Sequence, residues 1–224
     1  MDWGALLLSL ELALWTTFIL LAIGLPAAWW LVFRRRWWTP LVEAVIALPL
    51  VLPPTVLGFL VLTMIAPQTP IGRFWADLTG EPLAFSFSGL LTASVLYSLP
   101  FVVQPIAAGF AGVDTRVLEA AATLGASDRS TAIRVLIPLS WPAVVTGAVL
   151  GFAHTLGEFG VVLMVGGNLP GRTRTISIAI YDHVQSFEMA AATQTSLLLL
   201  GFSFVVLAVT YALQRRSPTP WPTR

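Results

Sequence analysis

Five long apolar segments alternate with short polar stretches along the chain of 224 residues. The segments cover residues 5–33, 41–66, 87–111, 142–166 and 190–213. A helix needs about 20 apolar residues to cross the hydrocarbon core of a bilayer, so each segment is long enough for one span. The pattern therefore predicts an all-α, polytopic membrane protein with about five transmembrane helices. Because the spans fill most of residues 1–224, we expect a single membrane domain without a separate soluble domain.

Composition supports a membrane protein, and the charge distribution predicts its orientation. Hydrophobic residues make up 57% of the chain and charged residues 10%, which is typical of membrane proteins. Nine arginines follow the first, third and fifth spans, namely Arg34, Arg35, Arg36, Arg116, Arg129, Arg134, Arg215, Arg216 and Arg224, while Arg73, Arg172 and Arg174 fall in the opposite loops. Because cationic loops stay in the cytoplasm, this bias predicts an N-terminus outside and a C-terminus inside.

Three further features narrow the functional classes. The first apolar segment has no basic start and no small-residue cleavage site, so we expect it to remain as a span. The chain has no cysteine, which excludes disulfides and thiolate metal sites. Its net charge of +1 reflects membrane topology, so no nucleic-acid partner is expected.

The second apolar segment contains three prolines. Pro49, Pro53 and Pro54 each lack an amide donor, so the carbonyls four residues earlier lose their helical hydrogen bonds. Within a bilayer such a break is tolerated where it faces protein or a water-filled cavity. Pro53, Pro54 and Thr55 are therefore candidates for lining a transport pathway or its gate. The alternative is a kink with a purely structural role.

The polar segment 112–140 predicts a helical hairpin on the arginine-rich, cytoplasmic side. Asp114 can cap a first helix over residues 115–124, in which three consecutive alanines give a face of small side chains. Gly125 can then adopt the left-handed conformation that reverses the chain. A compact hairpin of this kind suits insertion into a groove on a partner protein.

The second helix of the hairpin is expected to start after Ser127 as its N-cap and to run to about Leu136. Pro138 and Pro142 are expected to stop it before the chain re-enters the membrane, because proline removes amide donors. On the first helix, Glu119 offers either a charged contact for a partner or an acceptor for the hairpin's own amides.

The residues of this hairpin resemble the signature loop in the membrane subunits of bacterial ABC importers. The corresponding residues are Glu119, Ala120, Ala121, Gly125, Val135, Ile137 and Pro138. The resemblance implies a type I ABC importer permease fold in which this coupling loop docks into a cytoplasmic ATPase subunit. It also implies a bacterial inner-membrane assembly with a second copy of the chain, two ATPase subunits that bind ATP and Mg, and a periplasmic or lipid-anchored binding protein.

Further segments are similar to the molybdate permeases, the membrane subunits of molybdate ABC transporters. They are residues 47–59 with a Leu-Pro-Pro-Thr run, residues 98–105, and residues 156–173 with Gly-Glu-Phe-Gly followed by Asn-Leu-Pro-Gly-Arg-Thr. This resemblance covers nearly the whole chain and implies an importer of molybdate or tungstate. Sulfate and thiosulfate permeases share some of these elements and remain the alternative.

The sequence contains neither a Gly-x-x-x-x-Gly-Lys-Ser/Thr phosphate loop nor a nucleophile constellation. We therefore expect a transport subunit with no catalysis, cofactor or metal of its own. The span interiors also lack arginine, which favours conduction of a dianion over tight binding. A stand-alone secondary transporter and an intramembrane enzyme are the rival classes, but neither explains the cytoplasmic hairpin.

Two ionisable residues lie in the fourth apolar segment. His154 and Glu158 are four residues apart and would share one helical face. Ionisable groups at membrane depth normally face a partner or a cavity, so both are candidates for the pathway or gate. A hydrogen-bonded pair that packs helices is the alternative, and a metal site with the distant His183 is the weakest.

The loops on the external side are residues 67–86 and the turn-rich stretch after the fourth span. In the second loop, Asn168, Arg172 and Arg174 are candidates for guiding the anion or contacting the binding protein. A plain solvated loop is the alternative.

Overall fold

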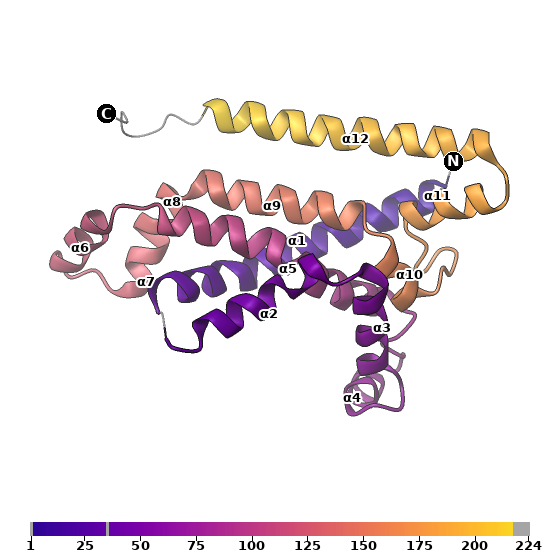
Figure 1. Cartoon of the computed structure of the whole chain (residues 1–224), viewed down its shortest axis with the longest axis horizontal. Coiled ribbons are helices and arrows are strands. Elements are labelled where there is room, and N and C mark those ends of the chain that lie inside the picture. Colours follow the sequence, from indigo (N-terminus) through magenta and orange to yellow (C-terminus); the bar gives the residue numbers. More distant parts are fainter. Residues whose placement is uncertain (1, 35, 217–224) are drawn as a thin grey trace.

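The structure is a computed structural model that describes residues 2–34 and 36–216. These ranges form helices and connecting turns without β-strands (Figure 1). In chain order the elements are α1 (Trp3–Phe33), α2 (Thr39–Val51), α3 (Pro54–Ile65), α4 (Pro70–Thr79), α5 (Phe87–Ala111), α6 (Thr115–Thr123), α7 (Asp128–Thr131), the π-helix η1 (Ala132–Leu136), α8 (Ile137–Leu139), α9 (Trp141–Leu156), α10 (Gly160–Gly166), α11 (Ile176–Gln185) and α12 (Met189–Arg216). The all-α fold class is thus confirmed over the described residues.

The long apolar helices run along the longest axis of the molecule (Figure 1). Among the described residues, α1, α5 and α12 are each long and apolar enough to cross a membrane alone. Two further spans arise if each bent helix pair counts as one: α2 with α3, bent by 115°, and residues 128–139 with α9, bent by 78°. The structure therefore supports three to five spans.

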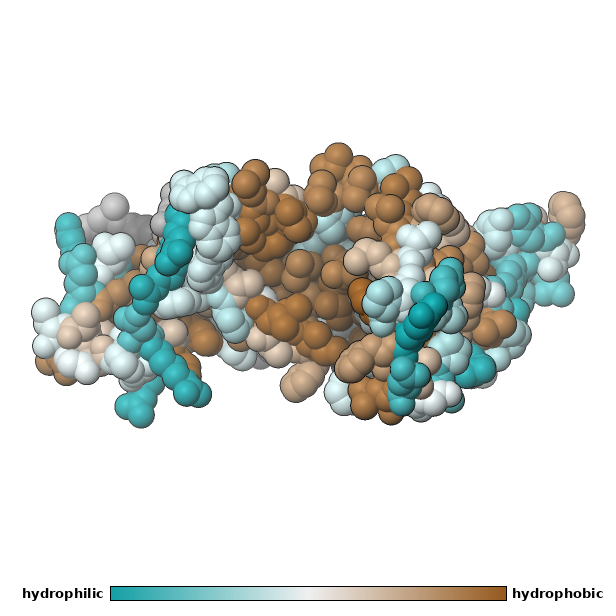
Figure 2. All heavy atoms as spheres, turned by 90° about the horizontal axis from the view of Figure 1, so that it is seen from below, coloured by the Kyte–Doolittle hydropathy of each residue, from teal (hydrophilic) through white to brown (hydrophobic). Residues whose placement is uncertain are grey.

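The short helices and turns gather toward the two ends of the bundle. The hairpin end carries α6, α7, α8 and the turn between α1 and α2, and the distal end carries the start of α1 with α4, α10 and α11 (Figure 1). On the face shown in Figure 2, hydrophobic residues fill the middle and hydrophilic ones gather toward both ends. This distribution suits a bundle whose middle is embedded in lipid.

The helix α5 is the centre of the bundle and packs against α1, α2, α9 and α10. A buried cluster in its hairpin-end half joins Leu20, Ala28 and Leu31 of α1, Ile46 of α2, Val102, Val103, Ile106 and Phe110 of α5, and Leu136 of η1. On α9, Gly147 and Gly151 face α5, and a Cβ at Gly147 would lie 3.0 Å from the Val102 carbonyl oxygen. Small residues spaced by four thus let the two backbones approach closely.

A second buried cluster holds the distal end together. It joins Leu57, Val61 and Ile65 of α3 to Leu83 and Ala84 of the loop before α5, Ala93 of α5, and Val161 and Val165 of α10. A Cβ at Gly58 would lie 3.1 Å from the backbone of Val161. The helices α3 and α10 therefore pack as a close pair.

The structure interrupts two of the expected apolar spans. The segment 41–66 breaks at Leu52 and Pro53, whose ψ angles of 135° and 137° are extended. The segment 142–166 is not one helix either, because α9 ends at Leu156 and α10 begins only at Gly160. Glycines at both edges of this second break weaken the helix there.

The loop 67–86 contains a helix that the apolar pattern did not predict. Thr69 caps α4 by accepting the amide of Gly72 at 3.0 Å, and Pro70 fills its first turn. Gly80 ends the helix in the left-handed region with φ 77°. These capping residues were the sequence signal that identifies α4.

The contact between α5 and α9 gives a prediction about stability. A methyl group added at Gly109 would overlap the Cβ of Ala143, so Gly109→Ala should destabilise the protein by about 1–3 kcal/mol through overpacking. Gly201→Ala in α12 meets nothing within 4 Å and should be neutral or stabilising by up to about 1 kcal/mol. Thermal unfolding of the two purified variants compares them, and equal melting temperatures would contradict this packing.

Candidate functional site

The hairpin end carries the 112–140 loop as two short helical segments joined by a tight turn. The Asp114 carboxylate accepts a backbone amide two residues later at 2.9 Å and starts α6. Gly125 adopts φ 81°. The amides of Gly125 and Ala126 donate to the carbonyls of Ala122 and Ala121 at 2.9 and 3.0 Å. This double hydrogen bond fixes a sharp reversal that only glycine adopts without strain.

The second segment of the hairpin is longer than expected. Ser127 caps it, accepting the amide three residues later at 3.3 Å, but the helical chain continues past Leu136 to Leu139. Pro138 therefore does not stop it. In η1 the amide of Ile137 donates to the carbonyl of Ala132, five residues earlier, so the hydrogen-bond register has shifted by one residue where Pro138 lacks its donor. Pro142 lies in the first turn of α9, where it starts a helix instead of ending one.

The outer face of α6 is apolar and exposed. Val117, Ala120, Ala121 and Leu124 follow the spacing of one helical face. The side chains of Val117 and Leu124 are 43% and 88% exposed, and α6 has no buried residue. Glu119 is exposed on the same helix, whose first amides are capped by a different carboxylate. This face is therefore open to a partner.

The inner side of the hairpin is fixed to the bundle. Leu136 is 1% exposed in the cluster around α5, Ile137 packs against the same cluster, and Val135 is half-buried beside them. At the end of α1, Arg34 forms a 2.6 Å ion pair with Asp128. A displacement of the hairpin would therefore move both α1 and α5.

The two breaks in the apolar segments lie side by side toward the distal end. Pro53, Pro54 and Thr55 are exposed on the surface of the chain at the first break. A Cβ at Gly160, which begins α10, would lie 2.9 Å from Pro54 and 3.5 Å from the amide nitrogen of Thr55. The start of α3 thus abuts the start of α10.

The ionisable pair does not lie on one helix. His154 is in α9, whereas Glu158 is in the break that follows and is 4% exposed. Ser94 Oγ donates to Glu158 Oε2 at 2.8 Å, and Ser98 Oγ lies 2.9 Å from His154 Nδ1. Both residues therefore bind α5 instead of each other. The second carboxylate oxygen, Oε1, is buried without a partner among the described residues.

Aromatic side chains of α5 complete the setting of His154. Its ring stacks on Phe101 with centroids 3.9 Å apart and lies 4.6 Å from the ring of Tyr97. The serines and aromatics are spaced three and four residues apart on α5, which is the signal that could have identified this face in the sequence. Within the described part of the chain, no three His, Cys, Asp or Glu side chains come together as metal ligands.

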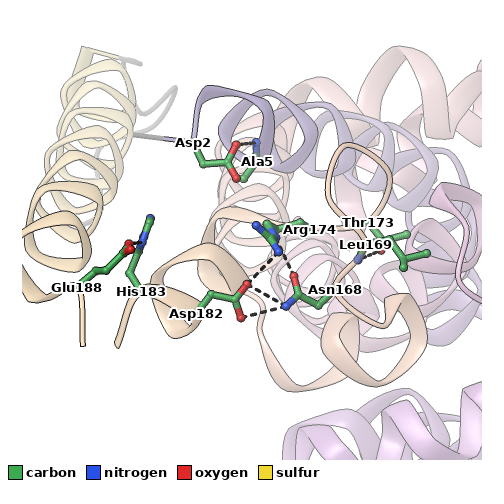
Figure 3. A network of polar contacts seen from close by, with 9 residues as sticks. All are labelled: Asp2, Ala5, Asn168, Leu169, Thr173, Arg174, Asp182, His183 and Glu188. Atoms are coloured by element: carbon green, nitrogen blue, oxygen red, sulfur yellow. Dashed lines mark hydrogen bonds and ion pairs between the residues drawn. The ribbon is translucent and has the colours of Figure 1, made fainter. Parts of the chain in front are cut away.

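The loop after α10 is tied to α11 by a polar network (Figure 3). Arg174 Nε donates to Asn168 Oδ1 at 2.8 Å, and the Asn168 amide donates to both carboxylate oxygens of Asp182 at 2.9 Å. A 3.2 Å ion pair between Arg174 and Asp182 closes the triangle. Asn168 and Arg174 are therefore engaged within the chain, through a partner that sequence reasoning missed.

Arg172 differs from the other two loop candidates. Its guanidinium is 3.7 Å from Glu81 on the loop before α5, and both side chains are more than 60% exposed. An exposed pair at this distance contributes little to stability. Arg172 is thus the one of these three residues whose charge faces solvent.

Together the helical bundle and its hairpin define a multi-pass membrane protein. Residues 20–217 match the family model described as binding-protein-dependent transport system inner membrane component. The chain belongs to this family of transport-system membrane components.

Several relatives align with nearly the whole chain and narrow the range of transport systems that it resembles. The molybdenum transport system permease protein ModB of Azotobacter vinelandii is 50% identical over 214 residues, which cover 96% of this chain and 95% of the relative. The Escherichia coli K12 protein of the same name is 35% identical over 217 residues, 96% and 95% of the two chains. A probable sulfate transport permease of Chlorella vulgaris is 30% identical over 211 residues, with 94% and 79% coverage.

Solved structures give the fold. A chain of a bacterial alginate ABC importer superposes with a TM-score of 0.76 at 16% identity, covering 96% of this chain and 79% of that one. A chain of the inward-facing MetNI methionine ABC transporter gives 0.71 at 17% identity, with coverage of 94% and 93%. The type I ABC importer permease fold is thereby confirmed.

The polar network around Asp182 gives a prediction that separates the two loop arginines, Arg174 and Arg172. Arg174→Gln should destabilise the protein by about 1–3 kcal/mol, because it removes a charged hydrogen bond and leaves the half-buried Asp182 carboxylate without its cation. Arg172→Gln should change stability by less than about 0.5 kcal/mol, since its ion pair is exposed. Chemical or thermal unfolding in detergent measures both, and the reverse order of effects would contradict the network of Figure 3.

Proposed function

We propose that this chain is the transmembrane permease subunit of an ATP-driven ABC importer for molybdate. Two copies form the translocation pathway, and each docks one cytoplasmic ATPase subunit that binds ATP and Mg. A periplasmic or lipid-anchored protein delivers the anion. The chain itself carries no catalysis. Its membership of a family of binding-protein-dependent transport components supports this assignment.

The observation that carries the docking step is the exposed apolar face of α6. Leu124 is 88% exposed at the end of a helix that has no buried residue. Burying a leucine side chain contributes about 1.5–3 kcal/mol, so a groove that covers this face would gain appreciable affinity. The small side chains of Ala120 and Ala121 allow such a groove to approach the helix backbone closely. Glu119 adds a charged contact at its edge.

The distribution of arginines supports placing the hairpin in the cytoplasm. Arg34, Arg36, Arg116, Arg129 and Arg134 lie at the hairpin end, whereas Arg73, Arg172 and Arg174 lie at the distal end. Cationic loops favour the cytoplasmic side. In this orientation α1 begins outside the cell membrane and α12 ends in the cytoplasm. The distal end would then face the binding protein.

The packing of the hairpin suggests how ATPase movement reaches the pathway. Closure of the two ATPases would bring the two hairpins together, and Leu136 and Arg34 would carry that movement into α5 and α1. At the distal end, α3 and α10 form a close pair beyond two helix breaks. We infer that this helix pair opens and closes the translocation pathway, with Pro53, Pro54 and Thr55 at its start. Glu158 and His154 hold the second break on α5.

The cargo assignment rests on the relatives. Two proteins named as molybdenum transport permeases are 50% and 35% identical along nearly the whole chain, against 30% for the sulfate transport relative. Tungstate is the same size and charge class as molybdate and is expected to share the pathway. A sulfate or thiosulfate importer is the second candidate.

Docking predicts a loss of coupling without a loss of folding. Leu124→Asp, placed on the open face of α6, should leave the amount of chain in the membrane unchanged but abolish ATPase co-purification and anion uptake. Glu119→Lys should weaken both. The matched control is Phe187→Asp, a side chain that is 85% exposed at the turn between α11 and α12, which should leave ATPase binding intact. Normal ATPase binding by Leu124→Asp would disprove the assignment of the hairpin.

Anion uptake also tests the class of transporter and its cargo. In cells that make the full system, molybdenum accumulation should require the ATPase gene and be inhibited by tungstate but not by a modest excess of sulfate. Uptake that survives loss of the ATPase and collapses with the ion gradient would indicate a secondary transporter. Accumulation of sulfate in preference to molybdate would favour the alternative cargo.

A further inference from the structure

An apolar groove opens on the bundle surface between α1 and the second segment of the hairpin. It has a volume of about 380 Å³. Its floor and walls come from Leu25, Pro26 and Trp29 of α1, Phe110 of α5, and Ile133 and Ile137 of the hairpin. Two charged residues, Asp128 and Arg129, also border it. The groove is thus apolar along most of its length and charged at one place.

The charged border lies at the outer end of the groove. Asp128 is paired at 2.6 Å with Arg34, the residue that directly follows α1. Leu25 lies eight residues before the end of α1, which corresponds to a depth of about 12 Å along the helix. The groove therefore runs from the level at which the span ends down into the hydrocarbon region.

The charge at this outer end is positive. Arg34 neutralises Asp128 and lies over the ring of Trp29 at 5.4 Å. Arg129 is exposed and has no ion pair among the described residues. The guanidinium of Arg129 thus lies without an ion pair at the end of the groove, at the level of the lipid headgroups. Trp29 borders the same groove, and tryptophan side chains are common at this interface.

We propose that this groove is a binding site for an anionic phospholipid of the surrounding leaflet. One acyl chain lies along Pro26, Ile133 and Ile137, and the lipid phosphate pairs with Arg129. The apolar floor at hydrocarbon depth suits an acyl chain, and the exposed guanidinium without an ion pair suits an anionic headgroup. The lipid would contact both α1 and the hairpin and fill the space between them. The proposal does not depend on the cargo.

The π-helix η1 shapes the groove. Ala132, Ile133 and Leu136 all belong to it and border the cavity. A π-turn is wider than an α-turn and often marks a functional site. Here the π-turn accommodates Pro138. It also spaces the side chains of η1 that form one wall of the groove.

The test uses the full chain in phosphatidylcholine nanodiscs with a photoactivatable phosphatidylglycerol that carries its reactive group on the acyl chain. Cross-links should fall on residues 25–29 and 132–137 and should exceed those from the phosphatidylcholine analogue. Arg129→Gln should raise the fraction of phosphatidylglycerol needed for half-saturation about fivefold, the equivalent of about 1 kcal/mol for one cationic side chain near an anionic surface. Equal labelling by the two lipids would overturn the proposal.

Two controls separate a specific lipid site from general surface attraction and from a protein contact. Arg134→Gln removes another exposed arginine, one that does not border the groove, so it should change half-saturation less than about twofold. A change as large as that of Arg129→Gln would indicate general surface attraction. Ile133→Cys introduces the only thiol in the chain. If that thiol forms a disulfide with a second copy in the nanodisc, a protein occupies the site and the lipid proposal is wrong. Failure of the lipid to label the groove would also overturn the proposal.

Discussion

The hydrocarbon core of a bilayer offers no hydrogen-bond partner to a backbone amide or carbonyl, and this constraint governs where the chain can depart from a helix. The described structure leaves the helix twice within its apolar segments, at Leu52–Pro53 and at residues 157–159. Each break packs against another part of the chain on one side, although Pro53, Pro54 and Thr55 are exposed on the other. The start of α10 covers the first through Gly160 and Pro54, and α5 holds the second through Ser94 and Glu158. The two breaks therefore share one packing contact, between Gly160 and Pro54.

The central helix α5 connects these breaks to the hairpin. Phe110 near its end packs in the same cluster as Leu136 of the hairpin, and Ser94 near its start holds Glu158. Sixteen residues separate these two points, about 24 Å along one helix. The hairpin and the second break are therefore joined by close packing along α5, with glycines on α9 bringing the backbones together.

Much of the fold could be predicted from the sequence, because helix bounds follow from strong local signals. The expected span 87–111 matches α5 in full, and Asp114 and Gly125 play the capping roles assigned to them. Tertiary partners were harder to predict. The Ser94 contact of Glu158 and the Asp182 contact of Arg174 join residues distant in the chain, and no local pattern identifies such a pair. For the same reason Arg174 and Arg172 look alike in the sequence, although only the first is held within a network.

Proline shows most clearly how context decides between a kink and a break. Pro26 lies inside α1, and Pro100 and Pro105 lie inside α5, without interrupting either helix. Each removes one hydrogen bond, which the neighbouring turns tolerate when the helix is packed on several sides. Pro53 and Pro54 remove two adjacent donors, and proline also drives the residue before it into an extended conformation. The helix axis therefore turns by 115° there. The start of α10 packs against this turn, because Gly160 lies beside Pro54. The proline motif of the first break and the glycine motif of the second, 104 residues apart between Pro54 and Glu158, therefore belong to one packing arrangement.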